Sequence, residues 1–174
     1  MRLEIERKYN SEAMVPRRED IKLEVLRLFR VIFKTAQQHA HCVETICGIS
    51  NAQLWALSEI SQNPGMRVTE LAEALSVHQT TASNLLDKLC KTGLIRRERI
   101  NEDQRVVSLF ITDSGQQMLA NSPRPTQGIL QSALFNLPDS TLTSLESNLN
   151  ELILIMDAKY FDAKMQPIDL ELGI

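Results

Sequence analysis

The stretch MRVTELAEALSVHQTTASNLLDKLCKTGLIRRERINEDQRVVSLFITDSG, residues 66–115, decides the fold. Its apolar residues first recur at helical spacing, in two sets separated by Ser76-Val77: Leu71, Ala74 and Leu75, then Leu85, Leu86 and Leu89. The period then changes from about 3.6 residues to about 2, in two runs: Leu94, Arg96 and Glu98, then Val107, Leu109 and Ile111. The stretch therefore predicts two helices joined by a tight turn and followed by a two-stranded hairpin, the arrangement of a winged helix.

Helical patterns also precede this stretch. A long helix is expected from Glu19 to about Cys42, ended by Gly48, with the apolar stripe Ile21, Val25, Leu28, Ile32 and Ala36 and a second row at Leu26, Phe29 and Phe33. A short helix is expected over Asn51–Gln62, because Asn63-Pro64-Gly65 follows it and stops helices. It carries Leu54, Trp55, Leu57 and Ile60.

Two further helices are expected after the hairpin. Thr112 is the predicted N-cap of the first, and Pro123 and Pro125 break it because neither has a backbone N–H. The last helix starts at Leu137-Pro138-Asp139-Ser140. Its apolar seam consists of Leu142, Leu145, Leu149, Leu152 and Met156. A seam with this heptad spacing needs another long helix as its partner.

These patterns predict a mainly α fold with a small β-hairpin wing. We expect a flexible N-terminal arm (residues 1–17), a helical dimerisation domain (18–50 and 116–162), a winged helix-turn-helix (51–115) and a tail (163–174) that frays unless a partner holds it. Packing of both ends into a homodimer would match palindromic DNA with half-sites about 10 bp apart. The alternative is that the same helices pack within a monomer.

Composition and charge narrow the class of protein. The chain has 174 residues, 43% of them hydrophobic and 24% charged, as expected for a globular domain. No apolar run approaches the ~20 residues that span a bilayer, and the first residues lack the apolar core of a signal peptide, so a cytoplasmic protein is expected. Its three cysteines form no CxxC pair and indicate reduced thiols. The net charge of −3 argues mildly against nucleic-acid binding, but residues 78–105 carry six basic and four acidic side chains.

The order of elements resembles the MarR family of transcriptional regulators. Four pieces carry the match: Thr69-Glu70-Leu71-Ala72-Glu73-Ala74-Leu75, then Thr80-Thr81-Ala82-Ser83-Asn84-Leu85-Leu86-Asp87-Lys88-Leu89, then Gly93-Leu94-Ile95-Arg96-Arg97, and lastly Asp103-Gln104-Arg105 with Leu109-Phe110-Ile111-Thr112-Asp113-Ser114-Gly115. The architecture matches from about residue 20 to about residue 160, and the sharp motifs lie within 68–115. The resemblance implies a dimeric DNA-binding regulator, most often a repressor, without a cofactor.

Candidate DNA contacts come from the second helix and the wing. The start of that helix offers polar side chains that can pair with bases or phosphates: His78, Gln79, Thr80, Ser83 and Asn84. Lys88, two turns on, suits a phosphate, and Arg97 lies on one face of the first wing strand. The resemblance implies that Arg105 enters the minor groove, with Asp103 orienting its guanidinium. The alternatives are a merely solvated helix face and a salt bridge within the hairpin.

The resemblance also implies a small aromatic effector, bound between the dimerisation domain and the winged helix, that shifts the dimer to a form with lower DNA affinity. Candidate lining residues are Phe33, His39, Trp55 and Met66, each of which also suits a hydrophobic core.

Three other functions compete with this interpretation. Cys42 or Cys47 could sense oxidants, although Glu44 opposes thiolate formation, and His39, His41, Cys42 and Glu44 could hold part of a metal site. An enzyme is not expected, because no phosphate-binding glycine loop, HExxH or GxSxG motif is present. A protein-interaction module built on a winged helix is the strongest rival, and the near-neutral charge favours it.

Overall fold

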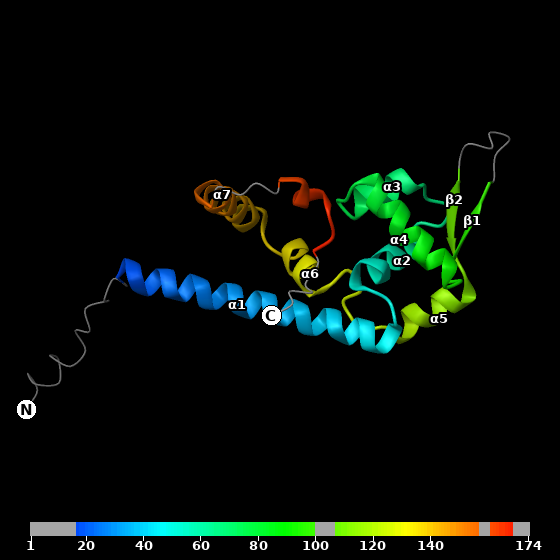
Figure 1. Ribbon diagram of the computed structural model, residues 1–174, viewed down its shortest axis with the longest axis horizontal. Helices are drawn as coiled ribbons and strands as arrows, with labels where there is room; N and C mark the ends of the chain where they lie inside the picture. The colour runs from blue at the N-terminus through cyan, green and yellow to red at the C-terminus, as the bar shows by residue number, and fades with distance from the viewer. Residues whose placement is uncertain (1–16, 100–106, 157–160, 169–174) are drawn as a thin grey trace, which may run out of the picture. The chain divides into compact units, whose positions relative to one another are not determined.

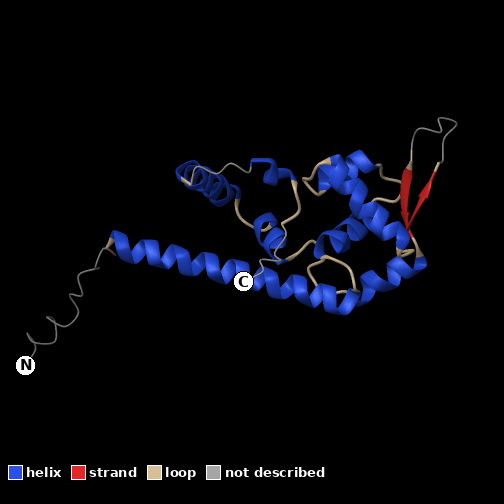
Figure 2. Ribbon diagram, viewed as in Figure 1, coloured by secondary structure: helices blue, strands red, loops and turns tan. Residues whose placement is uncertain are grey.

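The described part of the chain is helical apart from one antiparallel hairpin (Figures 1 and 2). The structure is a computed structural model that describes residues 17–99, 107–156 and 161–168. Its elements are α1 (Arg18–Cys47), α2 (Asn51–Gln62), α3 (Val68–Ala74), α4 (Gln79–Lys91), β1 (Ile95–Glu98), β2 (Ser108–Ile111), α5 (Asp113–Asn121), α6 (Ile129–Phe135), α7 (Asp139–Ile155) and the 3-10 helix η2 (Phe161–Met165). The predicted fold class, mainly α with a small hairpin wing, is confirmed.

Residues 1–34 and residues 35–174 form two separate compact units, each described by itself. Helix α1 is longer than predicted, because it continues past Cys42 to Cys47 and ends only where Gly48 adopts a positive φ of 67°. In the first unit the apolar side chains of α1 other than the half-buried Phe29 are exposed, among them Ile21, Leu28 and Phe33. In the second unit, Ala36 and Val43 of α1 are buried.

Helix α2 has the predicted bounds and begins with a capping box. The Ser50 hydroxyl accepts the backbone N–H of Gln53 at 3.3 Å, and the Gln53 side chain accepts the N–H of Ser50 at 3.0 Å. Leu54, Leu57 and Ile60 are fully buried, so α2 contributes a continuous face to the core of the second unit. The helix ends before Pro64-Gly65, as the sequence predicts.

Helices α3 and α4 are joined by the predicted tight turn, in which Ser76 has a φ of 52°. The Ser76 N–H donates to the Glu73 carbonyl at 3.0 Å and the Val77 N–H to the Ala72 carbonyl at 2.9 Å, the two bonds of a Schellman motif. Of the apolar residues at helical spacing in this part of the chain, Ala74 is exposed, whereas Leu71 and Leu75 are buried, as is Ala72. The core face of α3 is centred between Leu71 and Ala72, and Ala74 lies beyond its edge.

The hairpin is fixed to the helices by backbone hydrogen bonds. Strand β1 pairs with β2 from Ile95↔Ile111 to Glu98↔Ser108. On the other side of β2, the Leu109 N–H donates to the Met66 carbonyl at 3.0 Å, and its carbonyl accepts the Gly65 N–H at 2.8 Å. Strand β2 is therefore bonded to β1 on one side and to Gly65 and Met66 on the other, and Leu109 between them is fully buried.

Helix α5 begins at the predicted cap and makes a close approach to the hairpin. Thr112 accepts the N–H of Gly115 at 3.2 Å and donates its hydroxyl to the Gly93 carbonyl at 2.7 Å. A Cβ on Gly115 would overlap the Leu94 carbonyl and lie 2.7 Å from Cγ1 of Ile111. Only glycine therefore lets α5 pack this closely.

The segment after α5 is anchored by polar contacts. Helix α5 ends before Pro123, as predicted, and the carbonyl of Pro125 lies 3.1 Å from Nε2 of His39. The buried Thr126 hydroxyl bonds the Ser58 hydroxyl at 3.0 Å. Helix α6 was not predicted, because it is only seven residues long and its N-cap, Gly128, supplies no capping side chain.

Helix α7 starts at Asp139, as predicted, and its seam is largely exposed: Leu142 is 40%, Leu149 36% and Met156 67% exposed. In the tail that was expected to fray unless a partner holds it, residues 163–168 are described, and the Met165 carbonyl accepts the N–H of His78 at 2.9 Å. Within the described ranges, no helix is long and apolar enough to cross a membrane.

Substituting Gly115→Ala tests the close packing of α5. We expect the free energy of unfolding in urea to fall by about 1–3 kcal/mol, because the added methyl must displace backbone of the α4–β1 connection. Ser114→Ala, at the exposed neighbouring position, should change it by no more than about 0.5 kcal/mol. Equal stabilities of the two variants would contradict the packing described.

Candidate nucleic-acid interface

Helix α4 has one buried face and one polar face. Ala82, Leu85, Leu86 and Leu89 are buried in the core that α2, α3 and the hairpin also form. The opposite face presents the side chains Gln79, Thr80, Asn84, Asp87, Lys88 and Lys91, all exposed, with Ser83 half-buried beside them. Because the buried leucines fix the rotation of the helix, the predicted contact residues of α4 share one outward face.

The start of α4 has no side-chain cap. Its N-cap residue is His78, whose exposed imidazole makes no capping bond and whose φ and ψ are −63° and 147°. The backbone N–H groups and the helix dipole at such a start favour an anion. In this structure the N–H of His78 itself donates to the Met165 carbonyl, so an oxygen of the tail lies at this end of α4.

The first wing strand is joined to α4 by an ion pair. Nη2 of Arg97 lies 2.8 Å from Oδ1 of Asp87, and the two side chains are 37% and 55% exposed. A pair this exposed contributes at most about 1 kcal/mol to stability. Its main consequence is positional, because it holds the Arg97 guanidinium beside the polar face of α4. The sequence prediction assigned Arg97 a DNA contact and did not foresee Asp87 as its partner.

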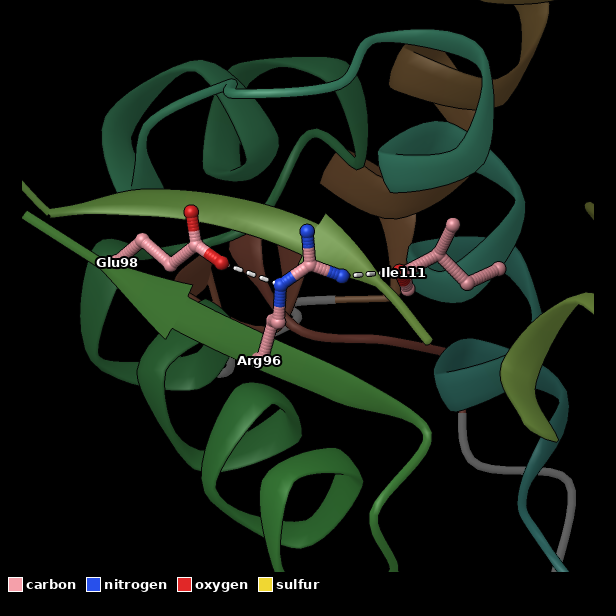
Figure 3. A network of polar contacts seen from close by, with 3 residues as sticks. All are labelled: Arg96, Glu98 and Ile111. Atoms are coloured by element: carbon pink, nitrogen blue, oxygen red, sulfur yellow. Dashed lines mark hydrogen bonds and ion pairs between the residues drawn. The ribbon is translucent and has the colours of Figure 1, made fainter. Parts of the chain in front are cut away.

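Arg96 lies on the other face of the hairpin and belongs to the wing's own structure (Figure 3). Its Nε donates to Glu98, its Nη1 donates to the Ile111 carbonyl at 3.2 Å, and its guanidinium lies 5.1 Å from the centre of the Phe110 ring. These contacts separate Arg96 from Arg97, as the alternation of a strand predicts.

The two predicted wing-tip residues, Asp103 and Arg105, lie outside the described residues and stay predictions. Arg99, just before that gap, is exposed, as are Lys88 and Lys91 on α4. Together with Arg97 these cations give the polar face a local positive charge that the net charge of the chain conceals.

A cavity of about 210 Å³ lies beside α4, bounded by α2, the α3–α4 turn and the tail. Its walls include Asn51, Trp55, Val77, Leu85, Gln131 and Ile168. Oδ1 of Asn51 is buried without a hydrogen-bond partner, whereas its Nδ2 donates to the Gln127 carbonyl at 3.3 Å. The cavity therefore combines an apolar wall with polar side chains, among them Gln131 and Gln166.

Of the four predicted effector-pocket residues, Trp55 lines this cavity. Met66 is 8% exposed and packs in the core, and the His39 ring bonds the Pro125 carbonyl. Phe33 belongs to the separate unit of residues 1–34, where it stacks on Phe29 with ring centres 6.1 Å apart. Helical spacing alone did not separate core residues from cavity residues.

The two cysteines of the oxidant-sensing alternative differ in exposure, since Cys42 is exposed and Cys47 is half-buried. Burial, and then the neighbouring Cys42 thiol, raises the pKa of Cys47 above its ordinary value, so its reactive thiolate is disfavoured at neutral pH. Burial is also the main cause that raises the pKa of Cys90.

Among residues 17–99, 107–156 and 161–168, no three His, Cys, Asp or Glu side chains come together as a possible metal site, and this includes His39, His41 and Glu44.

The residues of the helix-turn-helix match those of a protein family and of several transcriptional repressors. Residues 49–107 match the model of the MarR family. The HTH-type transcriptional repressor MdtR of Bacillus subtilis is 32% identical over 68 residues, which are 39% of this chain and 44% of MdtR. The transcriptional repressor MprA of Escherichia coli is 28% identical over 112 residues, 63% of this chain and 64% of MprA. The chain thus spans between about half and two thirds of the length of these relatives.

A solved structure shares the wider architecture. The MepR–DNA complex of Staphylococcus aureus superposes with a TM-score of 0.53 at 25% identity, covering 75% of this chain and 96% of that one. The match extends over most of MepR, so the likeness includes helices outside the helix-turn-helix.

The Asp87–Arg97 pair gives a test of the interface. In Asp87→Asn, Arg97 is released and a negative charge is removed from the polar face of α4, so affinity for duplex DNA should rise. The slope of log affinity against log salt should steepen by about 0.9 if Arg97 then neutralises one more phosphate. Glu151→Gln on α7, with the same charge change at an exposed position, is the control. Identical titrations of Asp87→Asn and wild type would show that Arg97 is not directed at DNA.

Proposed function

Because the chain belongs to the MarR family through its winged-helix domain, we propose that it is a transcriptional regulator, not an enzyme, that binds duplex DNA. The observation that carries this proposal is the polar face of α4, held outward by buried leucines and joined to the wing by Arg97. A face of short polar and basic side chains of this kind fits a major groove. The DNA-bound state of MepR, a relative in fold and sequence, supports the same assignment. DNA as the ligand also favours a cytoplasmic location.

In the proposed complex, different residues read bases and phosphates. Gln79 and Asn84 offer amides that pair with two atoms of adenine, and Thr80 offers a methyl to thymine or a hydroxyl to phosphate. Ser83, His78 and Lys88 are placed for the groove edges, where contacts position the protein without reading sequence. Arg105 enters the minor groove beside the wing, with Asp103 orienting it.

We propose that the regulator acts as a homodimer on a palindromic operator. The support is the unpartnered apolar surface of α7, with Leu154 and Ile155 74% and 76% exposed, and the similar row on α1 in residues 1–34. Exposed apolar rows on two long helices suit an interface between copies of the chain. Two polar α4 faces would then enter successive major grooves, which compensates for the modest charge of each.

The proposed regulation is release of a repressor by a small effector. The cavity beside α4 supplies an apolar wall together with the polar side chains of Gln131 and Gln166, which suits a small aromatic molecule carrying a polar group. An effector that prefers a dimer with altered spacing of the two α4 helices lowers DNA affinity by shifting populations. A tenfold loss requires only about 1.4 kcal/mol of preferential binding.

A mobility shift on the DNA upstream of its own coding sequence tests the proposed function. Wild-type affinity should fall at least about 100-fold between roughly 50 and 200 mM salt, because the complex releases counterions from several phosphates. Arg105→Ala should bind at least about fivefold more weakly, the loss expected for one groove contact. Arg124→Ala, an exposed arginine after α5, is the matched control and should bind like wild type.

Two outcomes would change the assignment. A salt-sensitive shift that is indifferent to Arg105 would keep a DNA-binding regulator and remove the wing contact. The absence of a shift at low salt, on this DNA and on genomic fragments, would favour the protein-interaction module.

The dimer is tested by Leu149→Glu, which places a charge in the exposed seam of α7, with Asn150→Glu at the adjacent exposed position as control. Light scattering after size exclusion should give wild type and control about twice the 19.7 kDa chain mass, and Leu149→Glu about one chain mass at micromolar concentration. A wild-type mass of one chain would reject the dimer.

A further inference from the structure

The segment of residues 161–168, coloured orange-red in Figure 1, lies against the start of α4. Residues 161–168, called the strap from here on, carry the Met165 carbonyl that accepts the His78 N–H at 2.9 Å. His78 is the N-cap of α4 and one of the proposed DNA contacts. The strap and the DNA phosphates are therefore expected at the same end of the same helix.

The strap also shares cavity walls with residues farther along α4. Four strap residues, Lys164, Gln166, Pro167 and Ile168, line the 210 Å³ cavity together with Leu85 of α4. Three of them, Gln166, Pro167 and Ile168, also line a second, more open cavity of about 620 Å³, whose walls include Leu85 and Lys88. The strap thus bonds the N-cap of α4 and shares the walls of two cavities with Leu85, one of which also includes Lys88, the proposed phosphate contact two turns on.

We propose that the strap is an intramolecular inhibitor of DNA binding, which covers the start of α4 in the free protein and must leave before phosphates reach His78. The proposal rests on the proposed function and adds a regulatory element to it. Two arrangements of the chain follow: a closed one with the strap on α4 and an open, binding-competent one. DNA affinity is reduced by the fraction of molecules that are closed.

The strap is held by contacts that suit a reversible device. Residues 163–166 are exposed, and Ile168 is 53% exposed although it lines both cavities. A segment with little buried apolar surface opens at low free-energy cost. A partner that binds the strap itself and takes Ile168 and its neighbours off the cavity would increase the DNA-competent fraction without altering α4 itself.

Ile168→Glu tests the proposal, because a carboxylate is disfavoured against the apolar wall that Trp55 and Val77 form. Ala163→Glu is the matched control, since it adds the same charge to the strap at an exposed position that lines neither cavity. Trp55 is the only tryptophan of the chain and lines the strap's cavity, so its emission reports the strap directly in the absence of DNA.

For Ile168→Glu we expect Trp55 emission to move to longer wavelength and affinity for the upstream DNA duplex to rise about fivefold or more. Ala163→Glu should leave the emission unchanged and bind DNA no more tightly than wild type. The expected rise in DNA affinity of Ile168→Glu is informative, because an added negative charge by itself weakens binding to DNA. Ile168→Ala, which only removes apolar contacts, should shift both readouts in the same direction by a smaller amount.

Unchanged Trp55 emission in Ile168→Glu would overturn the proposal by showing that the strap is not on the cavity. A shifted emission with unchanged or weaker DNA affinity would overturn the inhibitory role while leaving the contact. A shifted emission with no DNA binding by any variant, wild type included, would reject the proposed function and the inhibitory role with it.

Discussion

Burial of the leucine face of α4 is the constraint on which the rest of the structure depends. Leu86 and Leu89 are fully buried, and each contributes about 1.5–3 kcal/mol by leaving water. The helix cannot rotate about its axis without exposing them. The direction of the polar face is therefore fixed by the core, and the hairpin, clamped at Leu109 by Gly65 and Met66, is held in register with it.

Elements with local signals could be predicted from the sequence. The bounds of α2, the Thr112 cap of α5 and the start of α7 follow from residues within three positions of each other in the chain. These are Ser50 with Gln53, Thr112 with Gly115, and Pro138 before Asp139. Elements fixed by distant contacts were missed. The seven residues of α6 carry no cap of their own, and the strap is placed by its bond to a residue 87 positions earlier in the chain, His78 against Met165.

The same distinction holds at the candidate interface. The outward residues of α4 follow from periodicity, since an amphipathic helix reveals its polar face in one dimension. The partner of Arg97 could not be predicted from periodicity, because Asp87 is on another element. The cavity walls could not be predicted either, because they come from α2, the α3–α4 turn, α6 and the strap. Met66 and His39 were plausible cavity residues by type alone, and only the fold shows that one packs in the core and the other binds a loop carbonyl.

The uncapped start of α4 has a consequence for local dynamics. Helices α2 and α5 cover their first turns with Ser50 and Thr112, whereas His78 supplies no capping bond. The amide protons of the first turn of α4 should therefore exchange with solvent faster than those at the start of α2 or α5. An oxygen arriving from outside, whether a peptide carbonyl or a phosphate, completes that turn. In the proposed DNA complex, a phosphate at this position would therefore also stabilise the first turn of α4.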